Sequence, residues 1–177
     1  IVGGMANNII SYNGTNIGKS IKEKNCESII KEIFETSKNH SCDIFFPEDV
    51  LVGKSLTDKS EVKELDEIKD EDFILDIGPK TIKKIKEIIK TSETILWNGP
   101  AGYFENPNFA NGSYEIAKSI IKRNKDRSLY SVVGGGDTVA LINQMKAIKD
   151  FNFVSTAGGA FLEYLEGKEL PGIKALD

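Results

Sequence analysis

The sequence predicts an α/β fold in which a parallel β-sheet, covered by helices on both faces, forms the middle of three α/β/α layers. Short β-rich runs recur along the chain, and each is followed by a turn and then by a stretch with helical periodicity. The glycine-rich and polar stretches of the regular part all follow the ends of such runs, where open α/β sheets bind their ligands. At 177 residues the chain is long enough for one domain with a sizeable core.

The first part of the chain is the less regular one. Its expected elements are, in order, a β-rich end at 1–2 with a glycine turn at 3–4, a helix over 6–12, a helical region over 18–37, strands at 43–46 and 49–52, and a charged connector or short hairpin over 56–70. The apolar stripe expected for the helical region consists of Ile21, Ile29, Ile30, Ile33 and Phe34.

The rest of the chain repeats one pattern of strand, turn and helix four times. The expected units are a strand at 73–75 with a turn at 76–81 and a helix to 90; a strand at 94–97 with a turn at 98–102 and a helix over 113–123; a strand at 130–133 with a turn at 134–138 and a helix through 145; and a strand at 151–154 with a turn at 155–159 and a helix through 165. Trp97 ends one of these strands and is expected in the core.

Composition excludes several classes of protein. The formal net charge of −4 argues against a nucleic-acid binder, which would show a basic face. The apolar runs are only a few residues long, so we expect no membrane span, and no signal peptide is recognisable at the start. Cys26 and Cys42 lack the spacing of a metal site and are expected to be reduced, as in a cytoplasmic protein.

Two short stretches resemble motifs of other enzymes. The chain opens Ile-Val-Gly-Gly, as processed trypsin-like proteases do, but no serine stands in a suitable nucleophile context, and we expect the single histidine, His40, at the end of a helix. Residues 14–20 resemble a P-loop, yet three residues separate its glycines where that motif needs four. Neither interpretation is retained.

Residues 134–138, Gly-Gly-Gly-Asp-Thr, carry the strongest chemical signal. Their glycines let backbone N–H groups approach an anion, and the following helix directs the positive end of its dipole there. A carboxylate beside a phosphate would repel it, and Mg²⁺ held between Asp137 and phosphate oxygens removes that conflict. The same stretch can also be a simple glycine turn with an aspartate as helix N-cap.

Residues 155–159 repeat the arrangement one strand later, so two glycine-rich helix starts could contact one polyphosphate. After the strand at 94–97, Asn98, Pro100 and Glu105 offer an amide, a rigid turn and a carboxylate suited to a nucleoside.

Five stretches together resemble the phosphoglycerate kinase family. They are IVGGMAN from residue 1, LDIGPKT from 75, WNGPAGYFE from 97, VVGGGDT from 132 and STAGGAFLEYLEGKELPG from 155. They stand in that family's order and resemble its carboxyl-terminal, nucleotide-binding half, a Rossmann-like domain.

The resemblance implies phosphoryl transfer between 1,3-bisphosphoglycerate and Mg·ADP, giving 3-phosphoglycerate and Mg·ATP, by a cytoplasmic and monomeric glycolytic enzyme. It assigns roles to eleven residues of this chain. Gly3, Gly4 and Pro100 would line the adenine pocket, Asn98 would hold the nucleotide, Glu105 would accept hydrogen bonds from the ribose, Asp137 would bind the metal, Thr138 with the N–H groups of Gly135 and Gly136 would meet phosphates, and Gly158 and Gly159 would stabilise the transferring group.

The sequence also departs from the family pattern. The half that binds the triose substrate is absent, as are a glycine-alanine-lysine stretch and the first strand of the nucleotide domain, and Ala157 stands where a glycine is common. We therefore expect residues 1–177 to be one domain of a larger kinase and to be inactive alone. The alternative is a non-catalytic nucleotide-binding fragment. A dehydrogenase is disfavoured because its Gly-x-Gly-x-x-Gly fingerprint with a following acidic ribose ligand is missing.

Overall fold

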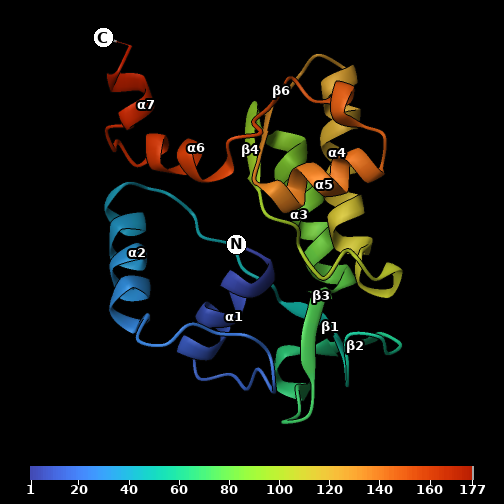
Figure 1. Ribbon diagram of the computed structural model, residues 1–177. Helices are drawn as coiled ribbons and strands as arrows, with labels where there is room; N and C mark the ends of the chain where they lie inside the picture. Colours follow the sequence, from blue (N-terminus) through green and yellow to red (C-terminus); the bar gives the residue numbers. More distant parts are fainter. Residues whose placement is uncertain (177) are drawn as a thin grey trace. The chain divides into compact units, whose positions relative to one another are not determined.

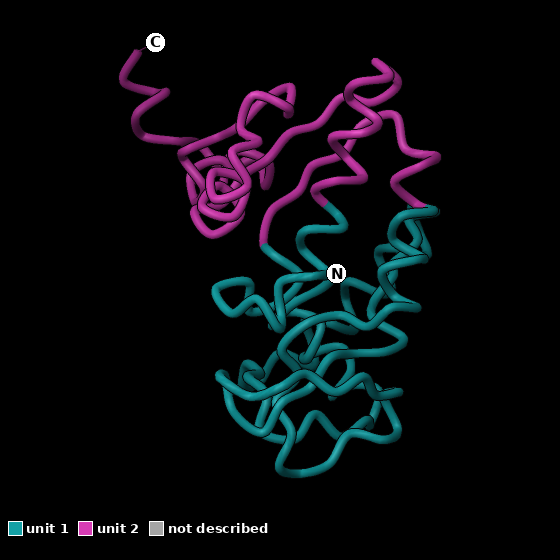
Figure 2. Tube along the Cα trace, turned by 90° about the vertical axis from the view of Figure 1, so that its right-hand side faces the viewer, with its two compact units in different colours: residues 1–87, 100–116 teal, residues 88–99, 117–177 magenta. Residues whose placement is uncertain are grey.

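The computed structural model describes residues 1–176, and the chain divides into two compact units. Unit 1 comprises residues 1–87 and 100–116, and unit 2 comprises residues 88–99 and 117–177 (Figure 2). The chain passes from one unit to the other within helix α3 (Pro79–Thr91), between Gly99 and Pro100, and within helix α4 (Asn111–Lys125).

Unit 1 is built around a small antiparallel sheet with the strand order β2-β1-β3. Its elements are α1 (Gly3–Tyr12), α2 (Glu27–Asn39), β1 (Asp49–Gly53), β2 (Glu61–Glu64), the 3₁₀ turn η1 (Leu65–Glu67), β3 (Phe73–Ile77) and the 3₁₀ turn η2 (Pro107–Phe109). The helix expected over 6–12 and the strand at 49–52 are confirmed. Residues 56–70 form no hairpin of their own, because their strand β2 pairs antiparallel with β1. The antiparallel pairing of β3 with β1 was not expected, since residues 73–75 read as a strand of a parallel sheet.

Two apolar clusters form the core of this unit. Val50, Val52 and Ile68 make one cluster, and Ala6, Ile10 and Ile17 make the other. Partly buried Leu65 and Ile74 pack against both, so the two clusters share a boundary beside β3.

Three expectations for unit 1 are wrong. Residues 43–46 form no strand, because Phe46 packs against the Ala6 cluster while the Phe45 carbonyl accepts the N-terminal amine at 2.6 Å. Residues 1–2 also lie outside strands. The helix expected from residue 18 begins only at Glu27, because the Lys19 N–H is bound to the carbonyl of Asp72 at 2.7 Å and holds this stretch as a loop.

The apolar stripe expected for α2 is mostly solvent-exposed. Ile30 alone of its five residues is buried, whereas Ile21 is 81% exposed. His40 is the C-cap of α2, as expected. Cys26 and Cys42 are both free thiols.

Unit 2 contains the parallel sheet that the sequence predicts, with the strand order β4-β5-β6. Its elements are β4 (Thr94–Asn98), β5 (Tyr130–Gly134), α5 (Gly136–Gln144), the 3₁₀ turn η3 (Ile148–Asp150), β6 (Phe153–Val154), α6 (Gly158–Leu165) and α7 (Pro171–Lys174). The strands and the helices α5 and α6 lie within a few residues of their expected ranges, whereas η3 and α7 were not expected. Helices α4 and α5 lie on one side of the strands (Figure 1). The α/β/α fold class is confirmed.

The core of unit 2 is apolar and closely packed. Val133 of β5, Leu141 and Ile142 of α5 and Ile120 of α4 are completely buried. Trp97 of β4 is also buried, with its ring 6.4 Å from that of Phe151, so its expected place in the core is confirmed. No helix among residues 1–176 is both long and apolar enough to cross a membrane.

Buried aspartates hold the first turns of the two helices that link the units. The Asp49 carboxylate accepts hydrogen bonds from the N–H groups of Lys80 and Thr81 at the start of α3, at 2.9 and 2.8 Å. The Asp76 carboxylate accepts the Gly112 N–H at the start of α4, at 2.8 Å. Negative charge at a helix N-terminus satisfies N–H groups that lack intrahelical acceptors and complements the helix dipole. Both aspartates thereby tie strands of unit 1 to these helices.

A third buried aspartate, Asp72, is paired with two lysines. Its carboxylate lies 2.8 Å from the Lys63 Nζ, which is itself buried, and 2.7 Å from the half-exposed Lys54 Nζ. Burial acts to raise the pKa of Asp72, but the hydrogen bonds from Lys54, Lys63 and the Lys69 N–H outweigh it and hold the pKa well below its ordinary value. The charged form of Asp72 is thus strongly favoured in the folded chain.

We expect Asp72→Asn to lower the free energy of unfolding by about 3–5 kcal/mol, because it removes the buried charge 2.8 Å from the Lys63 ammonium and leaves only the exposed Glu61 at 3.7 Å. Urea unfolding followed by circular dichroism measures the change. Glu71→Gln is the matched control, since Glu71 contacts the same Lys54 from a half-exposed position and should change stability by less than about 1 kcal/mol. Equal effects of the two substitutions would contradict the assignment of Asp72 as the central charge.

The pKa of Asp76 is shifted in the direction opposite to that of Asp72, and stability therefore depends on pH in the opposite sense. Burial raises its pKa to about 7, although hydrogen bonds from the N–H groups of Gly112 and Ile77 act against this. Between about pH 4 and 7 the folded chain keeps a proton that the unfolded chain has lost, so this group's contribution to stability falls as the pH rises.

We therefore expect the free energy of unfolding of the wild type to fall by a few kcal/mol relative to that of Asp76→Asn as the pH is raised from about 4 to 7. The asparagine does not titrate and lacks this pH dependence. Urea titrations of both proteins at several pH values test this. A difference that stays constant over that range would show that the pKa of Asp76 is not raised.

Candidate functional site

The two glycine-rich stretches of unit 2 meet in space. Gly135 precedes α5 in a left-handed conformation, with φ 86° and ψ 136°, which favours glycine. Gly158 opens α6, and a Cβ on it would lie 3.1 Å from the Gly135 Cα and 3.6 Å from the Gly136 nitrogen. A side chain on Gly158 would thus require a shift of a few tenths of an ångström, and the N-termini of α5 and α6 lie side by side at the carboxyl end of β5.

Both helix starts present backbone donors without side-chain caps. Neither Gly135 nor Ala157, the N-cap residues, makes a side-chain cap. Within the described part of the chain, no acceptor is seen for the N–H groups of Gly136, Asp137 and Thr138. The first N–H groups of a helix have no intrahelical acceptor and lie at the positive end of its dipole. This arrangement suits an anion such as a phosphate.

Asn98 adds a side-chain donor to this end of the sheet. It is the last residue of β4 and pairs with Gly134 in the parallel ladder. Its Oδ1 lies against Gly135, where an added Cβ would come within 2.4 Å of it. Its Nδ2 is buried without a hydrogen-bond acceptor among the described residues. A buried donor in this state costs roughly 1–3 kcal/mol, and an oxygen of a bound anion would satisfy it.

Thr138 lies at the same place, but its hydroxyl is already engaged. The side chain is completely buried, and its Oγ1 accepts the Gly99 N–H at 2.7 Å. The Gly99 carbonyl accepts the Trp97 Nε1–H at 2.8 Å. The sequence analysis did not include Gly99 among the site residues. The available signal was its position, since it directly follows a strand whose carboxyl end faces the expected ligand.

Asp137 is an exposed carboxylate in the first turn of α5. No group of three or more possible metal ligands exists among residues 1–176, so the protein alone offers no cage for a cation. Mg²⁺ commonly takes one or two carboxylates and completes its shell with phosphate oxygens and water. The single carboxylate beside an anion-binding end fits that coordination.

Ala157, the departure from the family pattern, is accommodated without strain. It precedes α6 with φ −99° and ψ 50°, a conformation outside the left-handed region that favours glycine. Its N–H is bound to the Ser155 Oγ at 3.3 Å. The methyl group therefore leaves the backbone donors of Gly158 and Gly159 in place.

The remaining candidate residues belong to unit 1. A Cβ on Gly3 would lie 3.0 Å from the Pro100 carbonyl oxygen, so these two residues of the expected adenine pocket are neighbours. Gly4 has open space around its Cα, and Glu105 is exposed in a turn. The site residues expected from the sequence thus fall into a group in unit 1 and a group in unit 2.

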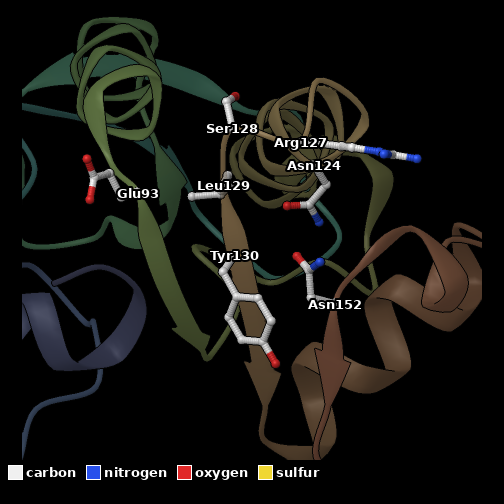
Figure 3. A pocket seen from close by; sticks show the side chains of 7 residues that line it. All are labelled: Glu93, Asn124, Arg127, Ser128, Leu129, Tyr130 and Asn152. Atoms are coloured by element: carbon white, nitrogen blue, oxygen red, sulfur yellow. The ribbon is translucent and has the colours of Figure 1, made fainter.

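A shallow hollow of about 510 Å³ lies at the other end of the parallel strands (Figure 3). It is lined by Glu93, Asn124, Arg127, Ser128, Leu129, Tyr130 and Asn152. Two of its polar groups serve the fold: Asn124 Nδ2 donates to the Ser131 Oγ and the Asp150 carbonyl, and Asn152 Oδ1 accepts the Ser131 N–H. Figure 3 shows the charged side chains of Glu93 and Arg127 pointing away from each other.

Together, the parallel sheet and the two uncapped helix starts at its carboxyl end define an α/β protein whose free backbone N–H groups lie where such folds can hold an anion. The family model of phosphoglycerate kinase matches residues 1–168. The chain therefore belongs to the phosphoglycerate kinase family.

Individual relatives agree with this assignment. The phosphoglycerate kinase of Zymomonas mobilis is 44% identical over 179 residues, covering 100% of this chain and 45% of the relative. That of Azorhizobium caulinodans is 43% identical, covering 99% of this chain and 45% of the relative. The solved phosphoglycerate kinase of Coxiella burnetii superposes with a TM-score of 0.91 at 37% identity, over 98% of this chain and 44% of that chain. The chain thus spans less than half the length of the relatives it matches.

We expect Gly135→Ala to lower the free energy of unfolding by about 2 kcal/mol or more, because its Cβ would be strained at φ 86° and would lie 2.4 Å from the Asn98 Oδ1. Gly136→Ala is the matched control, since nothing lies within 4 Å of its Cβ position. It should leave stability unchanged or raise it by up to about 1 kcal/mol. Urea unfolding followed by circular dichroism compares the two. A destabilised Gly136→Ala beside a neutral Gly135→Ala would contradict the described geometry.

Proposed function

We propose that this chain is the nucleotide-binding, carboxyl-terminal half of a phosphoglycerate kinase. The longer enzyme would transfer a phosphoryl group between 1,3-bisphosphoglycerate and Mg·ADP to give 3-phosphoglycerate and Mg·ATP. The observation that carries the proposal is the contact of the two uncapped helix starts at Gly135 and Gly158, beside the buried and unsatisfied Asn98 Nδ2.

Each group in unit 2 has a defined task in this proposal. The N–H groups of Gly135 and Gly136, with that of Thr138, bind the nucleotide phosphates at the N-terminus of α5. The N–H groups of Gly158 and Gly159 stabilise negative charge on the transferring group. Asn98 donates its free amide hydrogen to a phosphate oxygen. Phosphoryl transfer needs positioning and charge stabilisation more than covalent chemistry from the protein, and fixed backbone donors supply both.

Asp137 would hold Mg²⁺ through its exposed carboxylate. When bound, the cation neutralises part of the phosphate charge and orients its oxygens. Asp137 lies in the turn that carries the free N–H groups, so its carboxylate and these donors can serve one ligand. Gly3, Gly4 and Pro100 as lining of an adenine pocket, and Glu105 as acceptor of the ribose hydroxyls, stay predictions from the family resemblance.

Calorimetric titration of Mg·ADP into the chain tests the proposal. We expect the wild type to bind, and we expect Asp137→Asn or removal of Mg²⁺ to weaken the affinity about tenfold or more, because the phosphate charge then faces the helix start without a cation. Asp126→Asn is the matched control, since Asp126 is also exposed but lies just after α4, before β5 begins. It should bind as the wild type does.

Circular dichroism of every variant separates loss of binding from loss of the fold. A folded wild type that does not bind Mg·ADP would refute nucleotide binding by this chain. Equal affinity of wild type and Asp137→Asn would refute the metal assignment alone. Turnover of 1,3-bisphosphoglycerate by the longer protein decides between a kinase and the alternative of a non-catalytic nucleotide-binding fragment.

A further inference from the structure

The backbone of Gly99, which directly follows β4, is held by hydrogen bonds from two side chains. The Gly99 N–H donates to the Thr138 Oγ1 of α5 at 2.7 Å, and the Gly99 carbonyl accepts the Trp97 indole N–H at 2.8 Å. Gly99 itself has φ 103°, a conformation that favours glycine and that no regular structure would hold in place. The two side-chain hydrogen bonds therefore fix the two peptide groups on either side of Gly99, which would otherwise be free to rotate.

Both gripping side chains are themselves immobile. Thr138 is 0% exposed, and Trp97 is buried with its ring against Phe151. A hydrogen bond from a rigid buried group orders its partner more strongly than one from a mobile surface group, because no side-chain entropy remains to be lost. The conformation of Gly99 is thus set by the packed core of unit 2.

The residue next to this peptide is Asn98, whose amide is the unsatisfied donor of the site. Its Oδ1 lies against Gly135, and its backbone is bonded directly to Gly99, whose conformation is fixed by the two hydrogen bonds. Any rotation of the Gly99 peptide would shift Asn98 against the N-terminus of α5. A displacement of this kind, on the order of 1 Å, can weaken a preorganised site severely.

We propose that Thr138 and Trp97 are positioning residues, which hold the peptide groups before and after Gly99 and thereby keep the Asn98 amide aimed at the anion bound by α5. The proposal rests on the proposed function for the identity of that anion, a nucleoside diphosphate. It gives the Thr138 hydroxyl oxygen a structural task, because this oxygen accepts the Gly99 N–H inside the unit.

The first test measures the hydrogen bond between Thr138 and Gly99 without any ligand. In ¹⁵N-labelled chain, we expect the Gly99 amide hydrogen to exchange with solvent about tenfold faster in Thr138→Val, which replaces the hydroxyl by a methyl group of similar size. Thr138→Ser keeps the hydroxyl and should restore slow exchange. Ile142→Val is the control for general loosening of α5, since Ile142 is buried on the same helix away from Gly99. Unchanged Gly99 exchange in Thr138→Val would overturn the proposal.

The second test measures Mg·ADP affinity by calorimetry. We expect Thr138→Val and Trp97→Phe each to weaken binding about fivefold, as loss of one hydrogen bond would. The double variant should weaken it by less than the product of the two, because both hydrogen bonds fix the conformation of Gly99. Phe151→Leu, which loosens the packing of Trp97 but keeps its N–H, should weaken binding by less than Trp97→Phe does. Weakening by Thr138→Val with full affinity in Trp97→Phe would show direct phosphate contact and overturn the proposal.

The outcomes also separate this proposal from the proposed function. If the wild type binds no Mg·ADP, the proposed function fails, and the side-chain amide signals of Asn98 decide on the positioning role. One sharp pair of signals in the wild type and Thr138→Ser, broadened in Thr138→Val and Trp97→Phe, would support it. Equally sharp signals in all four proteins would refute it.

Discussion

Buried carboxylates at helix starts are the constraint on which this structure depends. Asp49 binds the first turn of α3 and Asp76 binds the first turn of α4, and these are the two helices that run from unit 1 into unit 2. A helix end that is buried without acceptors for its N–H groups is destabilised. The aspartates therefore settle where each helix begins, and with it which residues each helix delivers to the second unit.

At the carboxyl end of the parallel sheet, the decisive chemistry comes from the backbone. Gly135 and Gly158 lie so close that a side chain on Gly158 would be crowded, and the two helix starts present N–H groups there. Such donors cannot be protonated or deprotonated at ordinary pH and need no rearrangement when charge develops on a ligand. Asp137 alone contributes a formal charge to this group, which suits a ligand that arrives with its own cation.

The regular part of the chain was predictable because its signals are local. A β-rich run, a glycine turn and helical periodicity stand together at 94–165, and each needs only its own neighbours to form. The misassigned strand at 43–46 and the antiparallel pairing of β3 depend on contacts between distant residues, such as the Ile1 amine with the Phe45 carbonyl. The engagement of Thr138 by Gly99 spans 39 positions. The sequence resemblance suggested that Thr138 contacts a phosphate. The hydrogen bond from the Gly99 N–H to its hydroxyl oxygen is visible only in the folded chain.

The single tryptophan of the chain lies in unit 2, buried beside the residue that ends β4. Its indole is bound to the peptide between the two units' sequences, at Gly99. Indole emission therefore comes from unit 2 alone and shifts to longer wavelength when water reaches that ring. The antiparallel sheet of unit 1 contributes to the far-ultraviolet dichroism but has no such fluorophore. Loss of the packed core of unit 2 can thus be followed by fluorescence without a label, whereas the dichroism reports on both units.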